Sequence, residues 1–414
     1  MNAQRIIVGL DVGSSEIRTV VSSIDENSHN PSIIGVGTSE ALGFRKGLVI
    51  DVEEAVTSIS KALEEAERIS GEPIHSVFLG VGGHHLQALN SKGVVAISNP
   101  SGEIFEEDID RSLEAAQAMS IPPNRRILRI IPQSFSVDEQ TGIKYPVGMN
   151  GIRLEVDAHI VTGLTPCIRN LEKCVINSGV DIEDMIPNNL AAGDGVLTKR
   201  QKELGVVTID IGHGTTGVSV YEEGTILHTT MLPIGGENVT NDIAIGLKCS
   251  IDAAERIKLE FANCVPDNID SKEMIDLSLI SKIDMHQVSR KTLSEIVQAR
   301  YQEILQMVQN ELEKCERDGM LPAGVVITGG GSKIPNILEL ARETLKLPVQ
   351  IGFPQNFEGL VEKVDDPRYS TALGLVVWGA RFSQNDMNFK LSVPNLDWNK
   401  TLDSVKDWFK NLMP

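Results

Sequence analysis

Apolar positions along the chain follow two patterns, which predict both strands and helices. Runs rich in Val and Ile at Val8–Val21 and Val207–Val220 each read as a strand, a tight turn and a second strand. Apolar residues at helical spacing predict helices at Glu53–Ile69, Ile243–Phe261 and Arg290–Arg317. A mixture of strands and helices of this kind indicates an α/β fold.

The pattern changes in two places, and each change predicts a separate structural unit. Between about His84 and Thr162, short strand-like pieces surround one predicted helix at Asp108–Met119, which suggests an inserted subdomain. Residues 383–399 are polar and broken, and they read as a linker before Lys400–Pro414. A chain of 414 residues is also long enough for two lobes or domains.

The composition is that of a globular protein and excludes several classes of function. The formal net charge of -19 argues against a nucleic-acid partner, because phosphate backbones require clustered Lys and Arg. The five cysteines are scattered without a C-x-x-C pair, which favours reduced thiols over a disulfide framework or a zinc site. Neither a signal peptide nor a bilayer-spanning apolar run is visible, so we expect a cytoplasmic protein.

The two strand–turn–strand segments carry matching chemistry. Each has an aspartate just before the turn, Asp11 in the first and Asp210 in the second, of the kind that holds Mg²⁺ through its water shell. Small residues expose backbone N–H groups that form an anion site. A chance similarity of two tight β-turns is the alternative for either segment alone, and neither contains a P-loop. The residues predicted to contact phosphates are Gly13, Ser14, Ser15, Gly212, His213, Gly214, Thr215 and Thr216.

A third glycine-rich segment follows later in the chain. Val325–Leu345 reads as strand, glycine turn and helix, which would place backbone N–H groups at the start of a helix. Such a position suits a nucleotide phosphate or ribose. The residues concerned are Gly329, Gly330, Gly331 and Ser332.

Three glycine sites in this order resemble the phosphate-1, phosphate-2 and adenosine motifs of the actin-type ATPase superfamily. In that superfamily the segment Pro233–Thr240 is similar to the glycine pair near the sugar and phosphates, and Ala254–Lys258 to the adenosine-contacting helix. An exposed ion pair between Glu255 and Lys258 is the alternative for the second segment. The resemblance adds Gly235, Gly236, Asn238, Glu255 and Lys258 to the predicted ATP site.

Within the superfamily the chain most closely resembles the FtsA family of bacterial cell-division proteins. The similarity includes Gly43–Asp51, Gly80–His85 and Gly235–Ala244 and extends over nearly the whole chain. It implies a two-lobed α/β fold with an inserted α+β subdomain, called 1C, and a C-terminal amphipathic helix. The expected division is 1–83, 163–200 and part of 322–382 for subdomain 1A; 84–162 for 1C; 201–231 and most of 322–382 for 2A; 232–321 for 2B; 383–399 for the linker; and 400–414 for the helix.

Three positions depart from the motifs of the superfamily. His213 replaces a glycine and Gly217 replaces an aspartate in the phosphate-2 turn, which would weaken a contact to Mg²⁺ or water. Asn188 occupies the place at which related ATPases have Glu or Gln to orient the attacking water, and an asparagine is shorter and a poor base. We therefore expect ATP and Mg²⁺ to bind, with slow or undetectable hydrolysis.

The C-terminal segment reads as an amphipathic helix. Its apolar side chains share one arc of a helical wheel, with lysines toward one edge, as is typical of a helix at a lipid interface. A helix that docks back on its own core is the alternative, but the polar linker and the family resemblance favour membrane lipid. The predicted lipid contacts are Leu402, Val405, Lys406, Trp408, Phe409, Lys410, Leu412 and Met413.

The resemblance implies a tether on the cytoplasmic face of the cell membrane at the division site. Mg-ATP would close the lobes, the closed protein would self-associate into filaments, and subdomain 2B would receive the C-terminal peptide of the tubulin-like FtsZ, with Arg300 as one contact. Subdomain 1C would serve filament contacts and later division proteins. A PilM-like pilus-assembly ATPase is the closest alternative and lacks the tethered helix; a sugar kinase would need a substrate base, for which the sequence offers no candidate.

Overall fold

The computed structural model describes residues 5–24, 30–118, 121–281 and 284–385. It contains two mixed sheets that share five strands in the same order, a three-stranded antiparallel meander that continues into two parallel strands; the first sheet has the additional strand β19 beside β3. This repeat supports the duplication expected from the two strand–turn–strand segments. The first sheet has β1 Arg5–Val12, β2 Glu16–Ile24, β3 Ser32–Glu40, β6 Ser76–Val81, β11 Asp181–Pro187 and β19 Glu358–Gly359; the second has β12 Val206–Ile211, β13 Thr216–Glu222, β14 Thr225–Leu232, β17 Val325–Thr328 and β18 Val349–Ile351.

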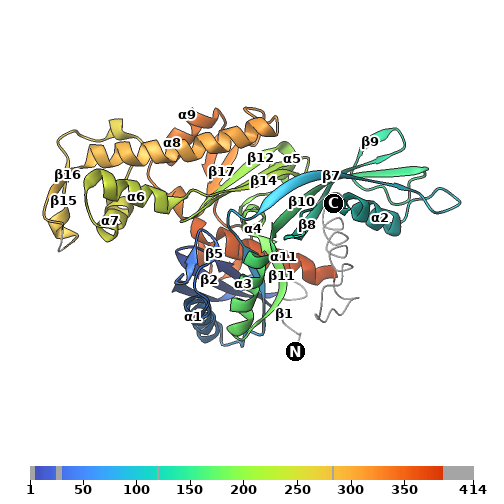
Figure 1. Ribbon diagram of the computed structural model, residues 1–414, viewed down its shortest axis with the longest axis horizontal. Helices are drawn as coiled ribbons and strands as arrows, with labels where there is room; N and C mark the ends of the chain where they lie inside the picture. Colours follow the sequence, from blue (N-terminus) through green and yellow to red (C-terminus); the bar gives the residue numbers. More distant parts are fainter. Residues whose placement is uncertain (1–4, 25–29, 119–120, 282–283, 386–414) are drawn as a thin grey trace.

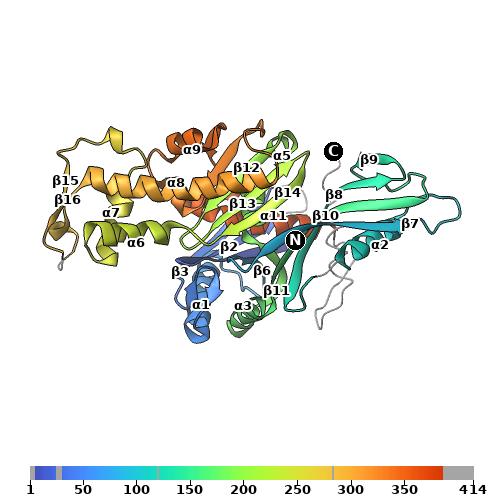
Figure 2. The ribbon, with the colours of Figure 1, turned by 45° about the horizontal axis from the view of Figure 1, so that its top comes forward.

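Helices cover both faces of the first sheet. Figure 2 shows α1 and α3 on one face and α11 on the other. Helix α1 begins after Asp51, whose side chain accepts a hydrogen bond from the N–H of Glu54, and it ends at Gly71 with φ 74°. The observed helix is one residue longer at each end than the predicted Glu53–Ile69 helix. The helices of the first lobe include α1 Val52–Ser70, α3 Thr165–Asn177 and α11 Ser370–Asn385; α4 Asn188–Val196 lies between the lobes, α5 Lys199–Leu204 and α9 Ile337–Leu345 contact the second sheet, and α10 Val361–Val364 follows β19.

A separate four-stranded sheet projects from the first lobe at one end of the molecule (Figure 1). It carries its own apolar cluster, with Phe135, Leu154 and Ala158 fully enclosed beneath one helix. This is the inserted module that the change of sequence pattern predicted. Its elements are β7 Gln87–Ala96, α2 Glu106–Gln117, β8 Arg125–Val137, β9 Gln140–Ile143 and β10 Arg153–Leu164.

The outer part of the second lobe lies at the opposite end and is mostly helical (Figure 1). The single helix predicted over Ile243–Phe261 is wrong, because the chain breaks at Lys248, which adopts φ 54°. Ser250 then caps a new helix by accepting from the N–H of Ala253. The elements are α6 Gly236–Leu247, α7 Ile251–Phe261, β15 Met274–Asp276, β16 Gln287–Ser289 and α8 Arg290–Lys314.

Two helices cross between the lobes and exchange partners. Helix α4 follows β11 of the first sheet, yet Asn189 donates to the carbonyl of Val218 in the second sheet (3.2 Å). After the second sheet the chain returns to the first sheet through β19, and α11 then packs on the first sheet, where a Cβ at Gly9 would lie 2.4 Å from the carbonyl oxygen of Ala372. At the crossing itself, a Cβ at Gly374 would lie 1.7 Å from the carbonyl oxygen of Ala191.

A buried ion cluster fastens the crossing helices at a second point. Asp194 of α4 accepts from Lys202 of α5 and pairs with Arg381 of α11 at 3.1 Å. Burial alone would raise the pKa of Asp194, but Arg381 and Lys202 outweigh it and lower that pKa to about 2. The carboxylate is therefore ionised at neutral pH and holds both cations.

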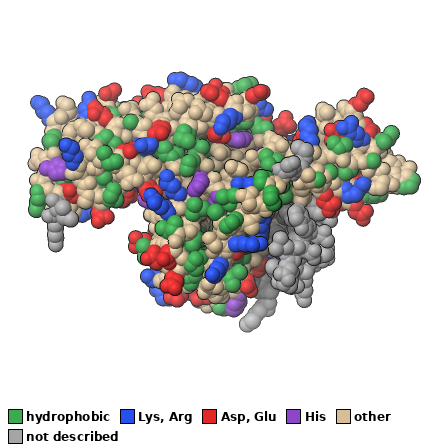
Figure 3. Space-filling model, in the orientation of Figure 1, with side chains coloured by type: hydrophobic (Ala, Val, Ile, Leu, Met, Phe, Trp, Pro, Cys, Tyr) green, Lys and Arg blue, Asp and Glu red, His purple; other side chains and the backbone are tan. Residues whose placement is uncertain are grey.

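Charge and hydropathy on the outside of the molecule agree with the composition. Acidic and basic side chains are interspersed on the face shown in Figure 3. Within the described ranges, no helix combines the length and the apolar character needed to cross a bilayer.

The close approach at Gly374 leads to a stability prediction. We expect Gly374→Ala to lower the free energy of unfolding by about 2–3 kcal/mol, because the added methyl would force the crossing helices apart. Gly246→Ala in α6 is the matched control, since its Cβ would meet only the side-chain end of Ile296 and alanine favours a helix. Denaturant unfolding measures both; an equal effect of the two variants would contradict the prediction.

Candidate functional site

The two predicted aspartates lie near the junction of the lobes, each at or near the end of the central strand of its sheet. Asp11 ends the run of β1 and is only 5% exposed, and Asp210 lies in β12. Burial raises the pKa of Asp11 to about 7; Arg18 opposes this rise, and the charge of Asp210 adds to it. Burial likewise raises the pKa of Asp210 to about 6, against a hydrogen bond from Thr371 and the charge of Arg18.

Each aspartate is contacted by the first turn of one crossing helix. Asn188, which begins α4, places its amide Nδ2 3.4 Å from Oδ1 of Asp11. Thr371, in the first turn of α11, places its hydroxyl 3.4 Å from Oδ2 of Asp210. Asn188 was predicted, but its counterpart Thr371 was missed, because only the duplicated fold relates the two positions.

The two glycine turns face each other. A Cβ at Gly214 would lie 3.1 Å from the hydroxyl of Ser14, which is across the junction in the first lobe. Gly13 and Ser14 are partly exposed, and Ser15 is exposed. This geometry agrees with the expected cradle, in which backbone N–H groups and hydroxyls of two turns surround one anion.

Supporting hydrogen bonds shape the second turn. The N–H of Gly212 donates to the carbonyl of Thr215 (2.9 Å), and the N–H of Gly236 donates to the carbonyl of Gly212 (2.9 Å). Asn238 accepts from the N–H of Gly235 (3.1 Å), so it braces the glycine pair. The predicted phosphate contact at Thr216 is not supported, because this residue is fully buried and its hydroxyl donates to the carbonyl of Ile234 (2.8 Å).

His213 and Gly217, the two residues of the second turn that depart from the motif, lie in different surroundings. Burial lowers the pKa of His213, and the charge of Lys258 lowers it further, so the imidazole is neutral at pH 7. Gly217 pairs with Asp210 in the β12–β13 register, and a Cβ there would lie 2.9 Å from the Cβ of Asn189. An aspartate at this position would collide with α4, so glycine permits the helix exchange.

Lys258 and the half-buried Glu255 form an ion pair beside the glycine pair. Nζ of Lys258 lies 2.6 Å from Glu255 and 2.8 Å from the hydroxyl of Thr240, and Lys258 is only 6% exposed. The alternative of a solvent-exposed ion pair is therefore wrong. Lys258 also donates to the carbonyl of Gly236 (3.3 Å), which ties α7 to the start of α6.

The third glycine segment lies against the second turn. A Cβ at Gly329, which has φ 79°, would lie 2.3 Å from Oδ1 of Asp210. The predicted start of a helix at these glycines is wrong, since residues Gly330–Lys333 form one 3₁₀ turn and α9 begins only at Ile337. The turn is held by Ser332, whose hydroxyl donates to the carbonyl of Gly329 (2.7 Å).

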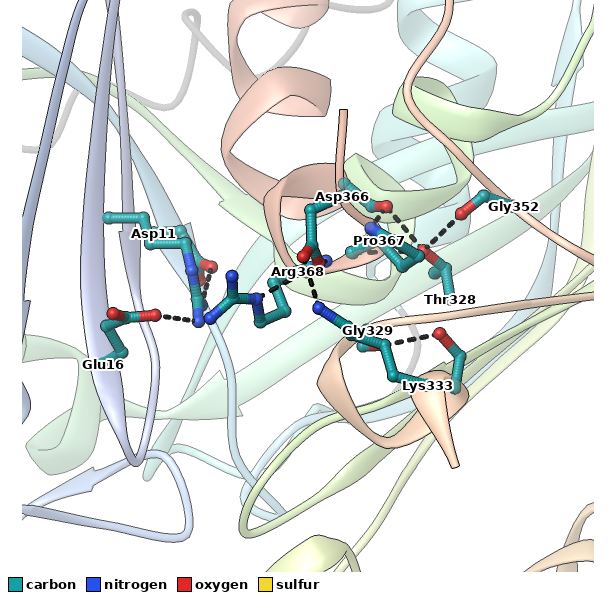
Figure 4. A network of polar contacts seen from close by, with 12 residues as sticks. Asp11, Glu16, Thr328, Gly329, Lys333, Gly352, Asp366, Pro367 and Arg368 are labelled. Atoms are coloured by element: carbon teal, nitrogen blue, oxygen red, sulfur yellow. Dashed lines mark hydrogen bonds and ion pairs between the residues drawn. The ribbon is translucent and has the colours of Figure 1, made fainter. Parts of the chain in front are cut away.

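An acidic and basic network connects this segment with the first turn (Figure 4). Asp366 accepts from Lys333 (2.6 Å) and from Arg368 (3.1 Å). On the other side, Arg18 pairs with Glu16 and lies 3.7 Å from Asp11. Arg18 was missed by sequence reasoning, although its cross-strand register opposite Asp11 was a usable signal.

The donor set at the junction fits Mg²⁺. Burial raises the pKa values of both carboxylates, Asp11 and Asp210, and the charge of Asp210 acts on Asp11. Oxygen donors of this kind, together with water, are what Mg²⁺ prefers. Asp11 and Asp210 would hold the ion through its water shell. Within the described ranges, no group of three or more His, Cys, Asp or Glu is arranged to hold a metal ion directly.

Two groups of predicted residues lie elsewhere. Arg300 lies on α8 in the outer second lobe, where it forms a two-point pair with Asp242 of α6 (2.5 and 3.0 Å) and a further pair with Glu303. Its guanidinium therefore links α8 to α6 and is only partly exposed. The predicted lipid contacts at 402–413 lie outside the described residues.

The raised pKa of Asp11 predicts a pH-dependent effect of its neutralisation. The pKa of the Asp11 carboxyl is about 7 in the folded protein and ordinarily 3.8. Ionisation of this group therefore destabilises the folded state more and more as pH rises from 3.8 toward 7. With a chelator present to remove divalent cations, we expect Asp11→Asn to raise Tm at pH 8 and to raise it less at pH 5. Exposed Glu139→Gln is the control and should change Tm little at either pH. A gain that is equal at both pH values would contradict the assignment.

Comparisons with known proteins agree with this geometry. The family model "Cell division protein FtsA" matches residues 207–374, and "SHS2 domain inserted in FTSA" matches residues 83–162. The chain is 39% identical to the cell division protein FtsA of Pseudomonas aeruginosa over 388 residues, which covers 94% of this chain and 92% of the relative. It is 39% identical to that of Borreliella burgdorferi, with 98% of both covered, and 37% identical to that of Bacillus subtilis, with 94% and 88% covered.

Solved structures share the fold at low sequence identity. A PilM-PilN type IV pilus biogenesis complex is similar with a TM-score of 0.65 and 15% identity, covering 90% of this chain and 98% of the other. MreB5 of Spiroplasma citri bound to ADP is similar with a TM-score of 0.56 and 15% identity, covering 93% and 99%. These likenesses show the two-lobed actin-like ATPase fold, and PilM stands only as a structural neighbour. With its sequence relatives and its inserted domain, the chain belongs to the FtsA family of cell division proteins.

Proposed function

We propose that this chain is an ATP-dependent tether that uses nucleotide to hold its lobes closed. The observation that supports this most directly is the facing pair of glycine turns, with the buried Asp11 behind the first and the partly buried Asp210 behind the second. The nucleoside would lie toward Gly329–Lys333, and the phosphates along the turns. MreB5 of Spiroplasma citri, which has the same fold, has been described with ADP and with AMPPNP bound.

The bound Mg²⁺ would supply positive charge to the phosphates, while the chain's own residues position it. Ionised Asp11 and Asp210 would orient its waters. Asn188 turns its amide Nδ2 toward Asp11, and an amide cannot accept the proton of an attacking water. Slow or negligible hydrolysis follows from this chemistry, so the bound nucleotide acts mainly to keep the two crossing helices in one arrangement.

Nucleotide binding and turnover test the site directly. We expect calorimetry to show Mg-ATP binding to the full chain, and steady-state phosphate release to remain far below the ~1–100 per second of kinases. Asp210→Asn should weaken binding, because one of the two Mg²⁺-orienting carboxylates is lost. Glu139→Gln, in the inserted module, is the control. The absence of binding at millimolar Mg-ATP, or turnover at kinase rates, would contradict this proposal.

In the proposed role, closed molecules self-associate into an actin-like filament on the cytoplasmic face of the cell membrane. The C-terminal segment from Lys400 would lie in the lipid interface, with Trp408 and Phe409 as apolar anchors. One short helix binds reversibly, so a filament that carries many of them is held far longer than a single molecule.

The outer second lobe is the proposed site for the C-terminal peptide of FtsZ. Arg300 is already paired with Asp242, so an acidic peptide would have to compete for the same guanidinium. The inserted module, at the far end of the molecule, is proposed to serve filament contacts and later division proteins. In this proposal, contacts through these surfaces would hold the tether at the division site.

Liposome co-sedimentation tests the tether. We expect the full chain to pellet with anionic liposomes and to carry FtsZ with it, and a version that ends at Ser392 to leave both in the supernatant. Mg-ATP should increase the pelleted fraction of the full chain only. The substitution Trp408→Glu should resemble the truncation, and Asp403→Asn should not weaken binding. Equal pelleting of the full and shortened chains would refute the anchor.

A further inference from the structure

A small hairpin crosses from the first lobe to the phosphate turn of the second. It consists of β4 (Phe44–Arg45) and β5 (Leu48–Val49), and its turn residues Lys46 and Gly47 both have positive φ, 49° and 74°. Tight hairpin turns of this geometry usually have Asn, Asp or Gly at both central positions. A lysine held in the left-handed region at the junction of the lobes suggests a task for its side chain.

The tip of this hairpin contacts both phosphate turns. The N–H of Gly47 donates to the hydroxyl oxygen of Ser14 (2.9 Å), and Nζ of Lys46 donates to the carbonyl of Pro233 (3.3 Å). A Cβ at Gly214 would lie 3.0 Å from the Cα of Lys46. Because Gly47 occupies an acceptor position of Ser14, the proton of that hydroxyl is free to be donated to a ligand.

Lys46 and the third glycine segment lie at different parts of the second turn, so the two ends of a bound nucleotide would meet different residues. The third glycine segment lies against the beginning of the second turn, where a Cβ at Gly331 would be 2.4 Å from the side chain of Ile211. Lys46 lies against the tip of the same turn at Gly214. A nucleotide whose nucleoside is at the glycine segment, with its phosphates along the turn, would therefore bring its last phosphate to Lys46.

The charge of Lys46 is the one best placed to meet that phosphate. Arg18 is occupied by Glu16, and Lys258 by Glu255, so these cations already have carboxylate partners. Lys46 donates instead to the neutral carbonyl of Pro233. An ammonium group that leaves a carbonyl for a phosphate oxygen exchanges a neutral hydrogen bond for a charge-assisted one.

We propose that Lys46 binds the terminal phosphate of a nucleoside triphosphate, and that the β4–β5 hairpin is the element that distinguishes triphosphate from diphosphate. This inference rests on the nucleotide site proposed above. With triphosphate present, the hairpin of the first lobe is joined through Lys46 to a ligand held by the second lobe, which keeps the lobes closed. With diphosphate, Lys46 has only the carbonyl of Pro233, and this connection is lost.

The experiment compares the binding of Mg-ATP and Mg-ADP to the full chain and to two charge-matched variants. Lys46→Met removes the ammonium but keeps an unbranched side chain. Arg45→Met, at the neighbouring exposed position of the hairpin, changes the net charge equally. We expect Lys46→Met to weaken Mg-ATP binding by about tenfold or more, because a charge-assisted hydrogen bond is lost, and to change Mg-ADP binding less than about twofold. Lys46→Arg should restore most of the preference for ATP.

Each other outcome has a definite meaning. Equal weakening of ATP and ADP by Lys46→Met would show that Lys46 acts through lobe packing, and would overturn the inference while the nucleotide site stands. Unchanged binding of both nucleotides, or an equal effect of Arg45→Met, would overturn it as well. Absence of binding by the unmodified chain would overturn the proposed function and this inference together. Thermal unfolding confirms that each variant is folded.

Discussion

The exchange of two helices between the lobes is the constraint on which the rest of the structure depends. Helix α4 carries the chain from the first sheet onto the second, and α11 packs on the first sheet after β19 has brought the chain back to it. They cross where Gly374 approaches Ala191 more closely than any side chain allows. Since each helix also begins beside one of the two aspartates, Asp11 or Asp210, the crossing angle and the site geometry cannot change independently.

The site gathers charge that the surrounding protein does not fully neutralise. Burial raises the pKa values of Asp11 and Asp210, because Arg18 only partly compensates the loss of water. At the other end of the crossing helices the balance is reversed, since Arg381 and Lys202 hold Asp194 ionised. The structure thus combines a satisfied ion cluster that fixes the crossing with an unsatisfied pair that a hydrated cation would relieve.

The inserted module is bound to the second lobe as well as to the first. Gln133 of its sheet donates to the carbonyl of Ile226 in β14 (2.8 Å), and His159 contacts the hydroxyl of Thr229 (2.8 Å). Burial lowers the pKa of His159 to about 3, so this imidazole stays neutral and acts as a fixed hydrogen-bonding group. A movement of one lobe relative to the other would therefore displace the inserted module or break these contacts.

Local pattern was sufficient for the elements and for the motifs. The spacing of apolar residues, the caps at Asp51 and Gly71, and the repeated aspartate–glycine turns are short-range properties, so the sequence alone determined most strands, most helices, the inserted module and the family. The sequence did not predict the break at Lys248, because the apolar spacing continues across it. Tertiary structure alone decided that Thr371 matches Asn188 and that Gly217 makes room for α4, because these relations join residues far apart in the chain through packing.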